Sequence, residues 1–148
     1  MRLWRISSWR GLDGIGGYHK DGRWHTRGRP VIYAAEHPAL ATLEALAHLR
    51  PSSANIPLSL KLIAIDIGEQ APHSEQPDLP PGWQANETST QAVGDAWLAS
   101  CGALALPVPS AVVAHSTNYV INPAHPQAAI HLSEGPVEAF WFDRRHLA

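Results

Sequence analysis

The sequence contains very little cysteine and no long apolar run. Its single cysteine, Cys101, excludes a disulfide within the chain and is typical of a reducing compartment. No stretch approaches the roughly 20 consecutive apolar residues that a membrane helix requires. The first residues, MRLWRISSWRG, also lack the continuous apolar segment of a secretory signal. We therefore expect a cytoplasmic protein.

The chain has no excess of positive charge either. Its 11 Lys and Arg residues against 13 Asp and Glu residues give a formal net charge of −2. General nucleic-acid binders are usually distinctly basic, so this charge balance argues against that class. A net charge of −2 is still compatible with a local basic cleft. With 148 residues, of which 45% are hydrophobic and 16% charged, the chain is long and apolar enough for one domain over 1–148 with a real core.

Three common catalytic signatures are missing. None of the nine histidines forms a helical i, i+4 pair around a glutamate and there is no CxxC, so we expect no metal site. Ser110 lacks a GxSxG context, so a nucleophile elbow is not indicated. A non-catalytic interpretation of Ser110 is a turn serine whose hydroxyl bonds to its own backbone. The four glycines between Gly11 and Gly17 predict a mobile loop. They do not predict a dinucleotide-binding turn, because no strand–turn–helix unit surrounds them.

Segments rich in β-branched and aromatic residues, bounded by prolines and glycines, predict the strands. They cover residues 3–6, 29–35, 58–67, 103–113, 118–123 and 137–143. Pro107 and Pro109 interrupt the fourth segment, and because proline donates nothing to a ladder, that strand is expected at an edge or bent.

Two segments have helical spacing of their apolar residues. The first begins with Pro38 in its first turn and ends before Pro51. The second runs from Thr88, where Thr88–Gln91 resembles a capping box, to about Ser100. The proline-rich segment 68–87 between the third strand and this helix predicts a long surface loop, and such loops are often functional.

The stretch from Gly22 to Arg50 carries the candidate chemistry. It places a cation, Arg23, an aromatic hydroxyl, Tyr33, and a carboxylate, Glu44, in succession. The helical neighbours of Glu44 are mostly apolar, and an unpaired, partly buried carboxylate is costly. Glu44 therefore either pairs with a cation such as Arg23 or lines a cleft, and the pattern leaves both alternatives open.

Together with Ser110, these residue types suit cleavage of the N-glycosidic bond of NAD. Departure of the base leaves positive charge on a ribose, which a nearby carboxylate such as Glu44 stabilises. Tyr33 offers a platform for the nicotinamide, and Arg23 offers bidentate contacts to a pyrophosphate. Trp24 either stacks on a base or fills the core, and the second is the more common situation for tryptophan. Composition alone does not single out this reaction.

The chain resembles the RES domain, the toxin half of RES–Xre toxin–antitoxin modules. The matching segments keep the family order over nearly the whole chain, and the ordered set is specific although each segment alone is weak. They are Gly22-Arg23-Trp24, Val31-Ile32-Tyr33-Ala34, Leu43-Glu44, Gly94-Asp95-Ala96-Trp97, Val108-Pro109-Ser110 and Asn118-Tyr119-Val120-Ile121-Asn122-Pro123 with His125-Pro126. The family is named after an arginine, a glutamate and a serine, which map to Arg23, Glu44 and Ser110.

The resemblance implies a single compact α/β (α+β) domain similar to ADP-ribosyltransferases of the diphtheria-toxin type. Its sheets would be mixed or antiparallel, with a few flanking helices. NAD would be a substrate, consumed by hydrolysis or phosphorolysis in some members and by protein ADP-ribosylation in others, and no cofactor would be bound permanently. An Xre-like helix-turn-helix antitoxin would cover or enter the active cleft. The implied catalytic residues are Glu44, Arg23, Tyr33 and Ser110, and the implied substrate contacts are Arg23, Trp24, Tyr33, Ser110 and Asn118.

Several functions remain in competition. NAD cleavage and ADP-ribosylation of a protein use the same pocket and differ only in what attacks the ribose. A ribonuclease-type toxin or a non-catalytic binding module would rely on scattered histidines and arginines near Trp24, and the acidic net charge speaks against it. One departure from the family pattern is Pro107, where relatives often carry a longer polar or basic residue. If that position contacts substrate, affinity or acceptor choice differs here.

Overall fold

The structure is a computed structural model that describes residues 1–147. No helix in this range has both the length and the apolar character needed to cross a bilayer. In chain order the elements are β1 (Arg2–Ser7), η1 (Ile15–Tyr18), β2 (Ile32–Ala35), α1 (Pro38–Leu49), β3 (Lys61–Ile67), η2 (Trp83–Ala85), α2 (Glu87–Ser100), β4 (Ala105–Pro109), β5 (Thr117–Ile121), α3 (Ala128–His131), β6 (Leu132–Ala139) and η3 (Arg144–His146).

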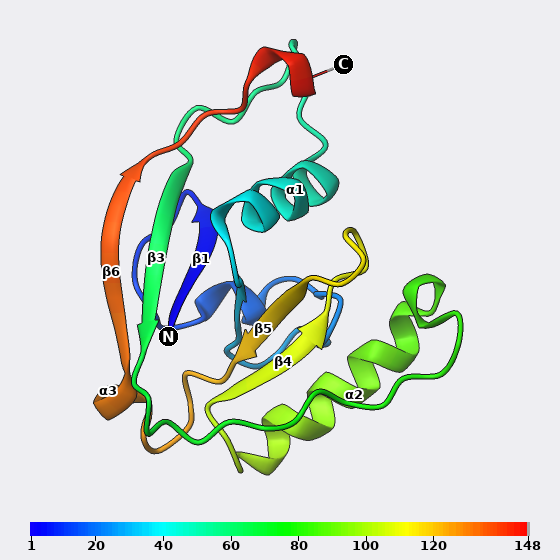
Figure 1. The fold of residues 1–148 in the computed structure, drawn as a ribbon, viewed down its shortest axis with the longest axis vertical. Coiled ribbons are helices and arrows are strands. Elements are labelled where there is room, and N and C mark those ends of the chain that lie inside the picture. Colours follow the sequence, from blue (N-terminus) through cyan, green and yellow to red (C-terminus); the bar gives the residue numbers. More distant parts are fainter. Residues whose placement is uncertain (148) are drawn as a thin grey trace.

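The six strands form one sheet in the order β4-β5-β2-β1-β3-β6, and every neighbouring pair is antiparallel. Figure 1 shows α1 beside the end of β1, α2 running beside β4, and the small α3 at the foot of β6. The helices do not alternate with the strands as βαβ units, which defines an α+β architecture. The predicted fold class is confirmed.

The strand register decides which side chains share a face, because partners in an antiparallel pair point to the same side. Tyr33 pairs with Val120, and Val108 pairs with Asn118, two residues from Val120. Tyr33, Val108 and Asn118 therefore lie on one face of the sheet. Ser110, two residues beyond Val108, continues the same row. We call this side the site face.

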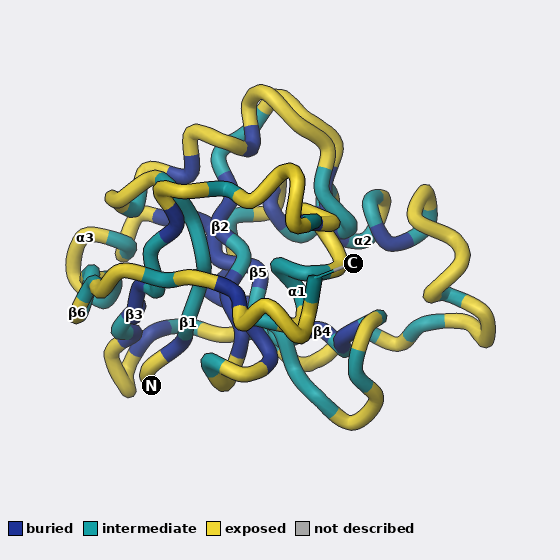
Figure 2. Tube along the Cα trace, turned by 90° about the horizontal axis from the view of Figure 1, so that it is seen from above, coloured by how far each residue is buried: buried dark blue, intermediate teal, exposed yellow. Residues whose placement is uncertain are grey.

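Apolar clusters cover both faces of the sheet. On the site face, α2 packs Leu98 against Val108 and Val120, and α1 packs Leu40 and Ala41 separately, against Ala35. Figure 2 shows these buried segments concentrated along the strands, with exposed residues on the surrounding loops. The candidate residues on the site face thus lie between two helices that are each fixed by their own cluster. The opposite face is filled by the largest cluster, which includes Leu3, Ile32, Ala34, Ile63, Ile65 and Ile121.

The ends of α1 follow the sequence closely. The Nδ1 atom of His37 accepts a hydrogen bond from the Ala39 N–H at 3.0 Å and so caps the helix, with Pro38 in the first turn. Arg50 adopts a left-handed conformation with φ of 47° immediately before Pro51. The helix predicted between Pro38 and Pro51 is confirmed.

The second helix begins slightly earlier than predicted. Asn86 caps α2, its side-chain oxygen accepting from the Ser89 N–H at 3.2 Å, so the capping box predicted at Thr88–Gln91 is wrong. Asn is as good a cap as Ser or Thr and lies directly after the 3-10 turn η2, which decides the position. The predicted end at Ser100 is confirmed, although Cys101, with φ of 50°, precedes Gly102 as the left-handed cap.

Four strand predictions need correction at their ends. The second strand covers Ile32–Ala35 instead of 29–35, and the fourth covers Ala105–Pro109 instead of 103–113. The third strand begins at Lys61 instead of Leu58, because its partner β1 ends at Ser7, opposite Lys61, and Leu58 is 94% exposed. The last strand covers Leu132–Ala139 instead of 137–143, because its ladder follows β3 from Ile67 to Lys61. After Ala139 the rings of Phe140 and Phe142 contact each other outside the ladder, whereas Trp141 is exposed. The short helix α3 was not predicted.

The backbone nitrogens of the two prolines in β4 face the outer edge of the sheet, away from β5. β4 is an edge strand, which confirms the prediction made from Pro107 and Pro109. The carbonyl of Ala105 accepts the Ser74 N–H at 2.9 Å on the outer side, and alternation directs Pro107 and Pro109 to that side too. Neither proline therefore removes a bond to β5.

The glycine-rich segment is ordered against the sheet. Residues Ile15–Tyr18 form a 3-10 turn, and Gly14 and Gly17 are buried. A side chain at Gly14, which has φ of 66°, would come within 2.7 Å of the Val31 nitrogen. The segment predicted as a mobile loop thus contains a 3-10 turn and packs closely against the start of β2, and its mobility stays a prediction.

Gly94 is where the chain before β2 touches α2. A Cβ at this position would overlap the carbonyl oxygen of Trp24, which belongs to backbone and cannot rotate away. In an ordinary helix, Gly→Ala stabilises by about 1 kcal/mol. Here the steric overlap reverses the sign, so Gly94→Ala is expected to destabilise by about 2 kcal/mol or more in chemical denaturation.

The control is Gly16→Ala, where an added Cβ meets nothing within 4 Å. That variant is expected to stay within about 0.5 kcal/mol of the wild type. Equal stability of the Gly94 and Gly16 variants would contradict the close packing of the Trp24 carbonyl on α2.

Candidate functional site

The carboxylate of Glu44 is held on the site face by two neutral donors. Its Oε1 accepts a hydrogen bond from Ser110 Oγ at 2.6 Å and from Asn118 Nδ2 at 2.7 Å. Within residues 1–147, no group donates to Oε2 and no cation lies within 4 Å of the carboxylate. Neutral donors orient a carboxylate without cancelling its charge. Of the two alternatives that the sequence left open for Glu44, the structure does not show the ion pair with Arg23.

Ser110 is both a turn serine and a contact of Glu44, so it fits both interpretations that its sequence context allowed. It follows β4 directly and is 7% exposed. Its Oγ accepts from the N–H groups of Val112 at 3.1 Å and Val113 at 3.0 Å, as a turn serine does. Because these two donors occupy the hydroxyl lone pairs, the hydroxyl hydrogen is left for Glu44. The turn thus aims the serine at the carboxylate.

Asn118 reaches Glu44 from the neighbouring strand. It lies near the start of β5, opposite Val108, and the register brings its amide under α1. The sequence predicted a substrate contact for Asn118, whereas the structure shows a contact to the carboxylate. Its role toward substrate stays a prediction.

Tyr33 shares the site face, but its hydroxyl is engaged inside the protein. The oxygen accepts from the Trp24 N–H at 3.2 Å and lies 2.5 Å from Nδ1 of His25. Burial raises the pKa of the Tyr33 hydroxyl far above its ordinary value, and the Trp24 N–H opposes this only partly. The hydroxyl therefore stays protonated at neutral pH.

Arg23 is positioned by α2. The hydroxyl of Thr90 donates to the Arg23 carbonyl at 2.6 Å, and Gln91 Nε2 donates to the Gly22 carbonyl at 2.9 Å. The guanidinium donates once within the described chain, from Nη1 to the Gln84 carbonyl at 3.2 Å. Because arginine carries five N–H donors, most of them remain for a ligand. The structure thus places Arg23 beside Tyr33 through the backbone and apart from the carboxylate.

Asp95 closes the same loop from its other end. Its two carboxylate oxygens accept from Thr26, at 2.9 Å from the backbone N–H and at 2.7 Å from Oγ1. The loop from Gly22 to Thr26 is therefore attached to successive turns of α2. Gly94 and Asp95, which are adjacent in α2, therefore both contact the loop that precedes β2.

Two possible substrate contacts, Trp24 and Pro107, are not supported by position. Trp24 is 3% exposed, packs on Leu98, and its ring centroid lies 6.0 Å from that of Trp83, so the structure favours the core alternative over stacking on a base. Pro107 pairs with Tyr119, which puts both on the face opposite Ser110. The departure at Pro107 therefore lies away from Glu44.

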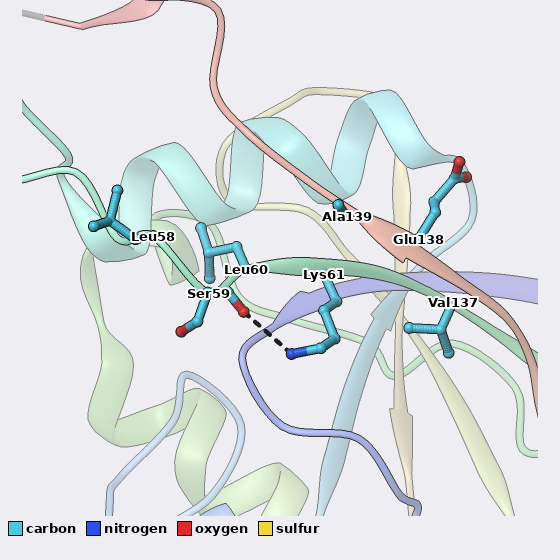
Figure 3. Close-up of a pocket in the computed structure, with 7 residues that line it drawn as sticks. All are labelled: Leu58, Ser59, Leu60, Lys61, Val137, Glu138 and Ala139. Carbon is cyan, nitrogen blue, oxygen red and sulfur yellow. Dashed lines mark hydrogen bonds between the residues drawn. The ribbon is translucent and has the colours of Figure 1, made fainter.

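Two surface hollows lie elsewhere. Figure 3 shows one at the adjoining ends of β3 and β6, lined by Leu58, Ser59, Leu60, Lys61, Val137, Glu138 and Ala139. The other, near the start of α1, is lined by Glu36, His37, Ala39, Leu40, Leu43, Val113 and Ser116. The second borders the site through the neighbour of Glu44 but includes none of the four catalytic candidates. Across residues 1–147, no three His, Cys, Asp or Glu side chains gather as a metal site would require.

A family model described as the RES domain matches residues 2–143. This chain belongs to the RES domain family. It is 45% identical over 128 residues to a Toxin Res of Pseudomonas putida, covering 86% of this chain and 88% of that protein. It is 37% identical over 123 residues to a Prs ADP-ribosylating toxin of a Sphingobium species, covering 79% and 75% of the two chains.

A solved structure shares the fold of this RES domain. The crystal structure of the Mycobacterium tuberculosis MbcT–MbcA toxin–antitoxin complex contains a chain that matches with a TM-score of 0.73. The match covers 95% of this chain and 84% of that chain at 18% sequence identity. At this identity the likeness concerns the fold.

Sequence reasoning on this RES domain overlooked His25. It is 2% exposed and contacts Tyr33 directly, yet it was considered only among scattered histidines. The available signal was its position directly after Gly22-Arg23-Trp24, eight residues before Tyr33. A polar residue that follows a motif and becomes buried needs a partner, and the tyrosine hydroxyl was a candidate.

Replacing Tyr33 by phenylalanine is expected to change how stability depends on pH. The unfolded chain ionises tyrosine near pH 10, whereas burial keeps the folded pKa of Tyr33 higher. The stabilising contribution of Tyr33 is therefore complete below about pH 10 and is lost as pH rises above it, at up to ~1.4 kcal/mol per pH unit. Chemical denaturation should show that the difference in free energy of unfolding between wild type and Tyr33→Phe is smaller at about pH 11 than at about pH 8.

Tyr18→Phe, at an exposed position, is the control for loss of a phenol. The narrowing for Tyr33→Phe must exceed any change seen in that control. A constant gap between wild type and Tyr33→Phe across the alkaline range would refute the burial argument.

Proposed function

We propose that this RES domain is a toxin that cleaves the nicotinamide–ribose bond of NAD. The observation that carries the proposal is the carboxylate of Glu44, held through Oε1 by Ser110 and Asn118 with Oε2 unpaired and no cation within 4 Å in residues 1–147. Oε2 is not among the fully buried unpaired atoms of residues 1–147, and the Glu44 side chain is only partly buried. A partly buried charge without a cation costs free energy of folding, and such charges cluster at functional sites.

The chemistry of NAD cleavage uses such a charge directly. The bond between ribose C1′ and the pyridinium nitrogen breaks, and its electron pair stays on the nitrogen. Nicotinamide therefore leaves as a neutral molecule, and the positive charge passes to the ribose as an oxocarbenium-like centre. A fixed carboxylate attracts this centre more strongly than it attracts the ribose of the ground state, which is the condition for acceleration.

Each remaining candidate has a role that its position supports. Arg23 binds the pyrophosphate with the guanidinium donors that the protein leaves unused. Tyr33 presents its ring to the nicotinamide, while Ser110 and Asn118 hold Glu44 in orientation. Water attacks the ribose and loses a proton to solvent, giving ADP-ribose. No metal or bound cofactor takes part in this scheme, and NAD is the substrate.

ADP-ribosylation of a cellular protein is the second candidate, supported by the relative named Prs ADP-ribosylating toxin. Both reactions pass through the same cationic ribose and differ in the attacking group. Water yields ADP-ribose, inorganic phosphate yields ADP-ribose 1″-phosphate, and a protein side chain yields a modified protein. Chromatography of products with and without phosphate, and adenylate-labelled NAD with cell extract, distinguish the three outcomes. RNA cleavage with intact NAD would instead establish a ribonuclease-type toxin.

Glu44→Gln is expected to lower kcat for NAD cleavage by about 10²–10³-fold, the effect of losing one preorganised electrostatic group. Glutamine keeps an oxygen that accepts from Ser110 and Asn118, so the melting temperature should change little. Product formation measured by chromatography, together with thermal denaturation, provides the test. Near wild-type turnover in this variant would refute the role of Glu44.

The matched control is Glu36→Gln, just before α1. The Glu36 side chain is exposed and accepts the Thr117 N–H at 2.9 Å, outside the proposed site. That variant should retain wild-type turnover. A similar loss in both variants would indicate a general charge effect instead of a site.

We also propose an antitoxin partner of the Xre-like helix-turn-helix type that covers the cleft, in the cytoplasm where NAD is available. The support is the family membership and the fold shared with a protein solved in a toxin–antitoxin complex. Expression of the wild-type chain alone should arrest growth, and expression of Glu44→Gln should not. Co-expression with a helix-turn-helix protein encoded next to this chain should restore growth and yield a stable complex. Growth unaffected by the wild-type chain alone would contradict the toxin assignment.

A further inference from the structure

His25 is a buried, titratable residue that the proposed mechanism leaves without a task. It is 2% exposed. Its Nδ1 atom lies 2.5 Å from the Tyr33 hydroxyl, and its Nε2 atom lies 3.3 Å from the Gly17 carbonyl oxygen. The imidazole therefore bridges the glycine-rich segment and the aromatic platform of the site.

The partners of the imidazole determine where its proton lies. A carbonyl oxygen only accepts, so Nε2, which faces Gly17, must carry the hydrogen. In the neutral ring Nδ1 is then an acceptor, and the Tyr33 hydroxyl donates to it. The Trp24 N–H donates to the hydroxyl oxygen from another direction. The hydroxyl of Tyr33 has therefore used its only hydrogen within the protein.

Gly22 encloses the same hydroxyl. A Cβ on Gly22 would overlap the Tyr33 hydroxyl and come within 2.7 Å of His25 Nδ1. The amide of Gln91 in turn holds the Gly22 carbonyl in place at 2.9 Å. The Tyr33 hydroxyl is thus surrounded by Gly22, the Trp24 N–H and the His25 ring, whereas the ring of Tyr33 is only partly buried against the cluster that contains Trp24.

We propose that His25 is a positioning residue that fixes the Tyr33 hydroxyl, so that Tyr33 serves the reaction through its ring and not as a proton donor. This proposal rests on the proposed function and deepens it. It agrees with the charge balance of the reaction, because nicotinamide leaves as a neutral base and needs no proton. The hydroxyl can therefore be used entirely as an anchor.

Two substitutions at His25 separate the two ends of the bridge. His25→Asn keeps an acceptor near the position of Nδ1 and loses the contact with Gly17. His25→Gln keeps a donor near the position of Nε2 and loses the acceptor for Tyr33. We expect kcat/KM for NAD within about threefold of wild type for His25→Asn and about tenfold lower for His25→Gln, since leaving the hydroxyl unpaired costs a hydrogen bond. Similar values for the two variants would overturn the proposal.

A double-mutant cycle with Tyr33→Phe excludes a merely structural effect. Without the hydroxyl there is nothing for residue 25 to hold, so the tenfold gap between His25→Asn and His25→Gln should vanish in the Tyr33→Phe background. Tyr33→Phe itself should lose about tenfold, and Tyr33→Leu, which lacks the ring, clearly more. A loss in Tyr33→Phe as large as that in Glu44→Gln would mean that the hydroxyl takes part in the chemistry, which would refute the proposal.

The anchor can also be tested without NAD. Nitrogen-15 NMR of the histidine side chains should show His25 with the hydrogen on Nε2, and Tyr33→Phe should shift its Nδ1 resonance. A hydrogen on Nδ1 would overturn the proposal. If the wild-type protein consumed no NAD while the spectra showed the expected pattern, the proposed function would fail and the anchor would stand. If the wild-type protein consumed NAD but His25→Asn and His25→Gln had equal kcat/KM values, the proposed function would stand and the anchor would fail.

Discussion

The structure depends on one interaction, the hydrogen bonds that Glu44 accepts on a single oxygen from Ser110 and Asn118. A carboxylate on an apolar helix usually finds a cation, which would lower its energy and remove its field. Neutral donors fix its geometry and preserve its charge. The rest of the fold must therefore offset the free-energy cost of a charge that no cation neutralises. The roles proposed for the other side chains of the site all depend on that charge.

The antiparallel register produces this arrangement. Because Tyr33, Asn118, Val108 and Ser110 alternate onto the same face, a residue from β2, one from β5 and one after β4 lie on the side of the sheet that α1 and α2 cover. α2 adds the loop that carries Arg23, attached through Thr90, Gln91 and Asp95. The sheet therefore positions the carboxylate and its donors, and α2 positions the guanidinium and the backbone around the tyrosine hydroxyl.

Part of this RES domain could be predicted from local chemistry. Pro38 and Pro51 bracket α1, and Pro107 and Pro109 indicate an edge strand, because proline acts on its own backbone. The ends of β3 and β6 could not be predicted, because they depend on where the partner strands stop.

The site was predictable to a similar degree. The candidates Glu44 and Ser110 were identified from their residue types and from the family resemblance, and the structure brings their side chains together. The pattern left open whether Glu44 pairs with a cation such as Arg23 or lines a cleft, because an apolar helix face shows that a carboxylate needs a partner and does not show which strand supplies it. His25 escaped notice for the same reason, since its importance arises from a contact that only the folded chain creates.

The donors of Glu44 have a consequence for synthesis of the chain. Ser110 and Asn118 are separated from Glu44 by 66 and 74 positions in the sequence. A nascent chain on the ribosome has its arginine, tyrosine and glutamate long before it has these donors, and β4 and β5 must dock before the carboxylate acquires its orientation. A truncated translation product that ends before residue 110 therefore lacks both side chains that hold the carboxylate.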